Sequence, residues 1–265
     1  MIPLETSALR LMVFFGCLSL LLLAEQLWPR RQRIFARFKR WRTNMGLVVL
    51  NSALLQLMGP VSAVAMAVLA TNHGWGLLSL IPLPLWADLL FGFVLLDLAI
   101  YLQHWAIHRI PILWRVHRVH HCDRDLDATT ALRFHPIEIV LSMIYKCGIV
   151  LILGPLALSV IIFEVVLNAS AMFNHANVTI PKRLDGWLRR VIVTPDMHRV
   201  HHSVRPAETD SNYGFCLSWW DQLFGTYLRE PKDGQLGMTI GLQEFQSNAP
   251  ASLLWSLRLP VSGRD

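Results

Sequence analysis

The sequence predicts an all-α protein, a multi-pass membrane helical bundle with a cytoplasmic histidine-rich metal-binding cap. Three observations predict this class. The chain of 265 residues is 54% hydrophobic and only 16% charged, whereas soluble domains carry about 25% charged residues. Its apolar runs are long enough to cross a hydrocarbon core of about 30 Å. Eight of its 11 histidines fall into three short clusters.

The N-terminal half predicts three membrane spans. The run 8–28 is interpreted as a retained span and not a cleaved signal peptide, because its basic flank follows the apolar run and no small-residue cleavage site closes it. The run 45–70 carries no charge and predicts a second span. The run 83–101 predicts a third, with Asp88 expected at the membrane interface.

Basic residues predict the orientation of these spans. Seven lysines and arginines lie between positions 30 and 42, and none follows until Arg109. The positive-inside rule therefore places the segment 30–42 in the cytoplasm and the loop 71–76 outside. The third span then brings His104 and His108 to the cytoplasmic face, while His73 is expected to be an ordinary loop residue on the opposite face.

The segment 137–173 predicts a helical hairpin. A single crossing would separate the last histidine cluster from the first two, and Gly154-Pro155 breaks the segment near its middle. The sequence predicts about four spans, or three spans plus this helical hairpin, and leaves open whether the hairpin spans fully or is re-entrant. In either case Lys146 and Glu164 should lie at similar depth, so we expect them to form an ion pair.

The three histidine clusters predict a metal site. They are His104-Trp-Ala-Ile-His108, His117-Arg-Val-His120-His121 and His198-Arg-Val-His201-His202. Histidines four apart share one helical face, whereas adjacent histidines diverge by about 100° and so suit two neighbouring ions. Neutral imidazole is the commonest protein ligand for transition metals. One such cluster alone is compatible with a solvated basic stretch, but three together predict two metal ions.

Other residues near the clusters are weaker candidates. His175 is expected to join the ligands, and His135 is equally compatible with a ligand, a hydrogen-bond partner of a ligand or a helix cap. Asp97 lies seven residues before His104 and is expected to orient an imidazole N–H, in preference to a bond between helices. Four further acids are candidates for that role or are ordinary surface residues: Asp123, Asp125, Asp127 and Asp196.

The sequence lacks the motifs of several other classes of site. The four cysteines form no C-x-x-C pair, and Cys122 beside His121 is weak support for a ligand. The chain contains no H-E-x-x-H, no glycine-rich nucleotide loop and no G-x-S-x-G. Membrane topology accounts for the basic residues better than a nucleic-acid partner does.

This pattern resembles the fatty acid hydroxylase/sterol desaturase superfamily of integral-membrane di-iron enzymes. Beyond the histidine clusters, similar stretches occur at 125–138, 173–177, 194–203, 212–215 and 220–226. The resemblance runs from about 91 to 227. It implies a metal-binding set of nine residues with no separate catalytic residue: His104, His108, His117, His120, His121, His175, His198, His201 and His202.

The resemblance also implies an activity. We expect two metal ions, iron in the working enzyme with zinc possible in isolated protein, and O2 as co-substrate. The implied reaction is hydroxylation of an unactivated C–H bond in a lipid or sterol-like substrate. A desaturase on the same scaffold is the main alternative. A metal-handling protein without catalysis is less favoured because the histidines lie at span ends, and a zinc hydrolase because no acid–base glutamate lies within the clusters.

The resemblance has consequences for organisation and partners. We expect N-terminal spans and a basic loop in 1–82, the catalytic domain in 83–228 and a C-terminal tail in 229–265. The N-terminal region has no room for an electron-transfer domain, so electrons should come from a separate protein. Arg109, Arg115 and Arg118 would dock an acidic partner or contact anionic lipid. The protein should lie in a bacterial inner membrane or the endoplasmic reticulum, with its active site facing the cytoplasm.

Overall fold

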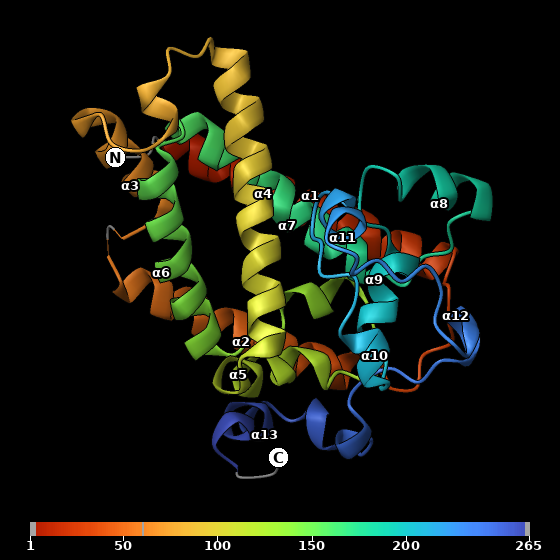
Figure 1. Ribbon diagram of the computed structural model, residues 1–265. Coiled ribbons are helices and arrows are strands. Elements are labelled where there is room, and N and C mark those ends of the chain that lie inside the picture. The colour runs from red at the N-terminus through yellow and green to blue at the C-terminus, as the bar shows by residue number, and fades with distance from the viewer. Residues whose placement is uncertain (1–3, 60, 263–265) are drawn as a thin grey trace.

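The computed structural model describes residues 4–59 and 61–262, and its regular structure there is helical, with three isolated β-bridges and no strand (Figure 1). Five helical stretches are long and apolar enough to cross a membrane. They are Ala8–Leu27, Ala63–Leu80, Leu85–Arg109, Pro136–Leu153 and Ala157–His175. The prediction of an all-helical, multi-pass membrane protein is therefore confirmed.

The membrane bundle is built from α3 (Ala63–His73), α4 (Leu85–Arg109), α6 (Pro136–Leu153) and α7 (Ala157–His175). In Figure 1 the yellow α4 runs through the middle of the molecule beside the green α6. Apolar side chains from these helices form one buried core that includes Leu96, Val150, Val160 and Phe163. The longest helix, α4, carries His104 and His108 in its last two turns, so the bundle ends at the histidines.

The predicted second span, 45–70, is wrong. Helix α2 (Arg37–Leu57) ends before Gly59, which has a left-handed φ of 65°, and α3 begins only at Ala63. A glycine in this conformation ends a helix without steric cost, and the Ser62 hydroxyl accepts a hydrogen bond from the Ala65 N–H to start the next. The candidate span here is Ala63–Leu80, and α2 packs against α6 at the histidine end of the bundle.

The predicted hairpin is confirmed. Helix α6 ends at Gly154, whose φ is 64°, and α7 returns to His175 at the level of the histidine clusters. The tip contacts the turn between α3 and α4, where the Leu77 N–H donates to the Ile152 carbonyl at 3.0 Å. Asp88, in the first turn of α4, is buried within the protein, and its carboxylate accepts from the Leu156 N–H and the Ser159 hydroxyl at the start of α7.

The predicted ion pair inside the hairpin is also confirmed. Lys146 Nζ lies 2.6 Å from Glu164 Oε1. A third member was not predicted: Arg10 of α1 (Leu4–Leu27) donates to the other carboxylate oxygen at 2.6 Å. Helix α1 packs along α7, so this contact joins three helices.

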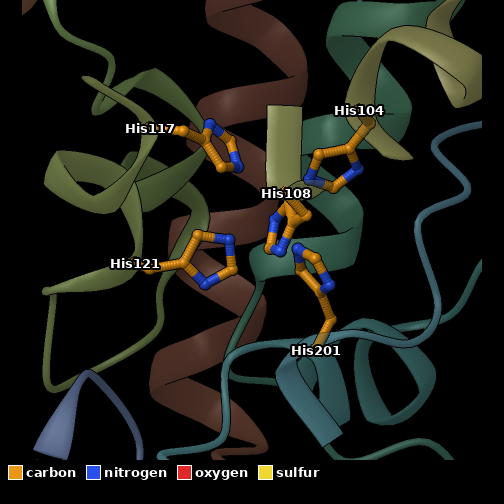
Figure 2. A group of neighbouring side chains, drawn as sticks. All are labelled: His104, His108, His117, His121 and His201. Carbon is orange, nitrogen blue, oxygen red and sulfur yellow. The ribbon is translucent and has the colours of Figure 1, made fainter. Parts of the chain in front are cut away.

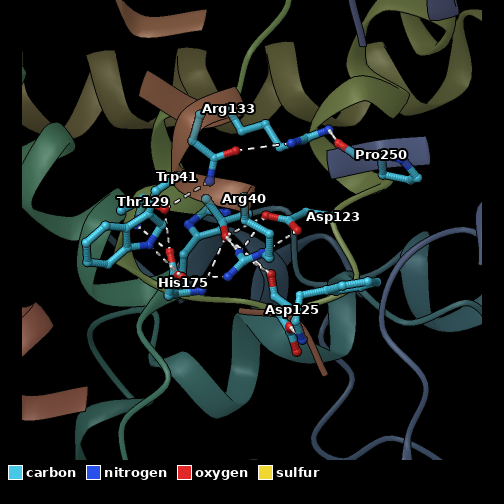
Figure 3. Close-up of polar contacts among 12 residues, drawn as sticks. Arg40, Trp41, Asp123, Asp125, Thr129, Arg133, His175 and Pro250 are labelled. Carbon is cyan, nitrogen blue, oxygen red and sulfur yellow. Dashed lines mark hydrogen bonds and ion pairs between the residues drawn. The ribbon is translucent and has the colours of Figure 1, made fainter. Parts of the chain in front are cut away.

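The basic segment 30–42 is not a solvated loop. Arg40 is buried and donates to both oxygens of Asp123, which Figure 3 shows beside it. It also donates to Asp127 and to Thr130. Further arginines of the segment pair with acids elsewhere: Arg30 with Asp196, and Arg33 and Arg37 with Glu25. A basic stretch that predicts topology therefore also holds the N-terminal region against the cap.

Short helices form the cap. They are α5 (Pro111–His121), α8 (Lys182–Leu188), α9 (Pro195–His201), α10 (Pro206–Thr209), α11 (Trp219–Leu223), α12 (Gly234–Gly237) and α13 (Leu253–Arg258). Five 3-10 turns connect them and the bundle: Leu78–Leu80, Ala128–Leu132, Gln243–Phe245, Ala249–Ala251 and Leu259–Val261. In Figure 1, α8 to α12 gather on the right, and α13 lies at the bottom, below α5.

We predict that Gly154→Ala destabilises the protein, because a Cβ there would lie 2.3 Å from the Trp75 carbonyl oxygen on a backbone with positive φ. The strain should lower the free energy of unfolding by about 1–3 kcal/mol. Gly148→Ala, inside α6 with nothing within 4 Å of its added Cβ, should be neutral or stabilising. Thermal unfolding in detergent measures both, and equal midpoints would contradict the tip contact.

Candidate metal centre

The nine histidines reach one site from four helix ends. Helix α4 brings two, α5 brings three and α9 with its C-terminal cap brings three. The ninth, His175, is the last residue of α7. Pro111 and Pro195 lie in the first turns of α5 and α9. Proline is favourable there because a backbone N–H at that position would have no acceptor within the helix. All nine imidazoles are buried. His108 as a whole residue is half-buried, but its side chain is covered.

The histidines divide into two groups. Figure 2 shows the rings of the first group turned toward one another: His104, His108, His117, His121 and His201. The second group contains His120, His175, His198 and His202. Within each group, candidate nitrogens all lie within 4.8 Å of one another. Pairs four residues apart stay together, and the neighbouring histidine turns to the other group, as the 100° step per residue predicts.

In the first group, each nitrogen facing inward lacks a partner. His104, His117 and His201 donate their Nδ1–H to oxygens at 2.6–2.8 Å, and His108 Nδ1 lies 3.4 Å from Asp210 Oδ1. Their Nε2 atoms are buried without a hydrogen bond, as are both nitrogens of His121. An imidazole whose Nδ1 carries the proton presents the Nε2 lone pair, which is the metal-binding form.

In the second group, four nitrogens converge on one point. His175 donates its Nδ1–H to the Ala171 carbonyl at 2.7 Å, so its Nε2 carries a lone pair. The Nε2 atoms of His120, His198 and His202 lie 3.1, 3.1 and 3.2 Å from it. A single lone pair cannot accept three hydrogen bonds, so these contacts call for a cation among the nitrogens.

The nitrogens fit metal ions in spacing and in charge. An ion bound by imidazoles at about 2.1 Å in tetrahedral geometry holds its ligand nitrogens roughly 3.4 Å apart, close to the spacing in the second group. Burial lowers the pKa of His201 to about 3, and His117 beside it adds to the effect. Burial likewise lowers the pKa of His121 and His202 well below the usual value. These rings are therefore neutral near pH 7, as metal ligation requires.

The two groups adjoin each other. The rings of His121 and His202 are stacked with centroids 4.5 Å apart, and those of His198 and His201 are 5.1 Å apart. Two bound ions would therefore be neighbours.

One short segment orients three histidines of the first group. The Tyr213 and Ser211 carbonyls accept from His104 and His201, each at 2.8 Å, and Asp210 faces His108. Between them Asn212 has a φ of 51°, a conformation that asparagine tolerates better than most residues. Its side-chain amide donates to the Met197 and Leu228 carbonyls, which fixes the segment against α9.

Two buried aspartates hold the segment that follows. Asp221 accepts from the Tyr213 and Gly214 N–H groups at 2.8 and 2.9 Å. Asp97 accepts from the N–H groups of Cys216 and Leu217 and from the Trp220 indole. The prediction that Asp97 orients an imidazole is wrong, because its oxygens accept hydrogen bonds from the segment that follows Tyr213 and not from a histidine.

Glu138 orients a histidine and was missed by the sequence analysis. Its Oε1 accepts from His117 Nδ1 at 2.6 Å, and both side chains are buried. A signal was present: Glu138 lies three residues after His135, in the first turn of a helix that starts beside the clusters. Carboxylates in this position fix the tautomer of a metal-binding histidine and raise its basicity.

A cavity of about 370 Å³ opens beside the first group. It lies between α4, α6 and α7, and His104, His117 and Phe215 stand at its histidine end. Apolar side chains such as Ile100, Met143 and Leu167 line much of the rest. The arrangement is two groups of metal-binding type next to a largely apolar cavity between helices that are long and apolar enough to cross a membrane.

The comparison with known proteins bears directly on this arrangement. The fatty acid hydroxylase family model matches residues 89–226, which is more than half of the chain. The chain belongs to the fatty acid hydroxylase family. This confirms the resemblance drawn from the histidine clusters.

Members of the family with known roles share part of their length with this chain. It is 30% identical to alkylglycerol monooxygenase of Xenopus tropicalis over 77% of this chain and 45% of that protein. It is 30% identical to ornithine lipid hydroxylase of Rhizobium tropici over 59% of this chain and 46% of that protein. A very-long-chain aldehyde decarbonylase of Oryza sativa is 28% identical over 57% of each chain.

The chain thus spans less than half the length of the first relatives that it matches. No solved structure matches it.

The structure also shows where the other candidate residues of the sequence lie. His135 is a helix cap: its Nδ1 accepts from the Ile137 N–H and its Nε2 lies 3.2 Å from the Leu257 carbonyl, and it belongs to neither histidine group. Asp196 pairs with Arg30 and Arg199 and not with a histidine. His73 is exposed and belongs to neither histidine group, but it is the last residue of α3 and not a loop residue.

The remaining acids and the cysteine have other partners. Asp123 and Asp127 accept from Arg40, and Asp125 accepts from the Ile34 and Phe35 N–H groups. Cys122 is buried, with its thiol facing the Val119 carbonyl at 3.2 Å. None of these four joins either histidine group of the described residues.

We predict that Glu138→Leu weakens metal binding by about 10- to 100-fold, because His117 then loses the acceptor that fixes its tautomer. Glu138→Gln is the matched control, since its amide oxygen can still accept the proton, and it should retain most of the metal. Retention during a chelator challenge of the purified protein measures this. Equal loss from both variants would contradict an orienting role.

Proposed function

We propose that this protein is a membrane-bound, O2-dependent di-iron enzyme that hydroxylates an unactivated C–H bond of a lipid or sterol-like substrate. The observation that carries the proposal is the pair of adjoining groups of buried imidazoles with unpartnered nitrogens, next to an apolar cavity. Family membership and the named relatives, two kinds of which are lipid oxygenases, support it. Desaturation on the same scaffold is the alternative, and metal handling without catalysis is less favoured.

The metal ligands of this proposal are the nine histidines of the two groups. The first group would hold one ion and the second group the other. Hydroxylation requires a metal that changes oxidation state, which zinc does not do, whereas imidazole suits iron well. Bound iron would supply the reduction of O2 and the oxidation of the C–H bond, with two electrons and two protons consumed and one water released.

The protein's own side chains position the substrate and keep out water. Because the cavity is largely apolar, the alkyl part of a lipid can enter it without losing favourable hydration. His104 and His117 stand at its end, so the carbon that reacts belongs beside the first group. The Glu138 carboxylate holds the His117 proton at Nδ1, which keeps Nε2 available inside the site.

Electrons would come from a separate partner protein. Arg109 and Arg115 are exposed near the site and suit an acidic partner, although anionic lipid would suit them too. Arg118 does not belong to this surface. It is buried, donates to the Leu259 carbonyl and lies over the Phe245 ring.

The placement in the membrane is also a proposal. We place the catalytic domain at 83–228, between N-terminal spans and a C-terminal tail whose α13 packs on α2. The histidine end would face the cytoplasm, in a bacterial inner membrane or the endoplasmic reticulum. At that interface a lipid could enter the cavity directly from the bilayer.

We predict that cells producing the protein accumulate a lipid that carries one oxygen atom from O2. His201→Ala should abolish the product, because it removes a nitrogen from the first group. His73→Ala, at the exposed far end, should leave it unchanged. Untargeted lipidomics under ¹⁸O2 measures this. A product with two fewer hydrogens and no ¹⁸O would establish the desaturase instead, and no difference between cells with and without the protein would contradict an enzyme.

A further inference from the structure

A charged cluster lies in the wall of the cavity, away from the histidines. Arg10 of α1, Lys146 of α6 and Glu164 of α7 all line it. Each cation is 2.6 Å from a different oxygen of the single carboxylate. The Glu164 side chain is 10% exposed, Lys146 17% and Arg10 29%, so the carboxylate is more covered than either cation.

The cluster carries one positive charge in excess. Two cations share one anion, and the only other acid among the described residues that line the cavity is Glu138, which is bonded to His117 at the histidine end. An uncompensated charge among membrane helices is costly, and such residues usually have a functional partner. A pair between Lys146 and Glu164 alone would have been neutral. The additional Arg10 leaves the cavity wall suited to an anion.

The cluster and the histidines belong to one continuous cavity. Lys146 follows Glu138 by eight residues on α6, which is about 12 Å at 1.5 Å per residue. Ser142 and Asn168, one helical turn nearer the histidines on α6 and α7, also line the cavity and add neutral polar groups next to the cluster. On α6 and α7 the lining between the cluster and the histidine end also includes the apolar Ile139, Met143 and Leu167.

We propose that the Arg10–Glu164–Lys146 cluster binds the anionic end of an amphiphilic substrate, a carboxylate or a phosphate. The alkyl part then extends through the cavity toward His104 and His117. This inference rests on the proposed function and names its substrate class. It also implies that the position of oxidation is set by distance from the anionic group, because the cluster fixes that end of the molecule.

Charge variants test the cluster through binding alone. The probes are palmitate, hexadecyl phosphate and the uncharged methyl palmitate, measured by calorimetry on the metal-loaded full chain in nanodiscs without oxygen. Lys146→Met leaves a neutral pair and should weaken anion binding about 10- to 100-fold, the effect of one lost charged hydrogen bond. Lys146→Arg should retain it. Methyl palmitate should bind all of these proteins alike.

The acid variants should move affinity in the opposite direction. Glu164→Gln raises the excess charge to two and should strengthen anion binding. The double variant Lys146→Met/Glu164→Gln keeps Arg10 alone and should return to near the original affinity. A cluster that only joins helices predicts instead that both single variants weaken all three probes in parallel, and that result would overturn the proposal.

The two anionic probes separate the sources of the ligand. Tighter binding of palmitate assigns a carboxylate and tighter binding of hexadecyl phosphate assigns a phosphate, and either supports the site. Equal affinity of the original protein for charged and uncharged probes would overturn it. Because oxygen is absent, a failure here leaves hydroxylation untouched, and an absence of oxidised lipid in cells would leave the binding result standing.

Discussion

The rest of the structure depends on the burial of nine imidazoles whose inward nitrogens have no protein partner. In the first group the Nε2 atoms of all five histidines are buried without a hydrogen bond, and in the second group three Nε2 atoms converge at 3.1–3.2 Å on the lone pair of His175. Each unsatisfied polar group costs about 1–3 kcal/mol, whereas a native protein is stable by only about 5–15 kcal/mol. Without bound cations, these unsatisfied nitrogens would therefore cost a large part of the free energy of unfolding. Metal ions bound by the nitrogens would remove that cost, and the spacing of the nitrogens fits them.

The architecture follows from bringing these rings together. Four helix ends meet only because the α6–α7 hairpin returns His175 to the level of α4, and its tip is fixed against the α3–α4 turn. In the first group the outer nitrogens of His104, His117 and His201 are then oriented by oxygens from two places, the segment 210–213 and Glu138. Arg40 connects α2 to the segment after α5 through Asp123 and Asp127, so the support extends to the N-terminal region.

Local patterns in the sequence predicted much of this site, and long-range pairing explains what they missed. The 3.6-residue period of the helix was enough to divide the histidines between two groups. The hairpin was predicted because a single membrane crossing would have separated the last histidine cluster from the first two. Nothing local shows that Asp97 meets residues some 120 positions away or that Asp221 holds Tyr213. The basic segment 30–42 predicted topology, but the pairing of its Arg30 and Arg40 depends on acids far along the chain. The break after Leu57 was visible in Gly59-Pro60, yet the absence of charge in 45–70 outweighed it.

The number of metal ions per chain tests the central claim most directly. Elemental analysis of purified protein, set against protein concentration, should give two iron ions per chain. His108→Ala removes a nitrogen from the first group and His198→Ala one from the second, and because the groups adjoin, each variant should lose both ions. One ion per chain in the original protein, or full occupancy in both variants, would contradict a site with two neighbouring metals.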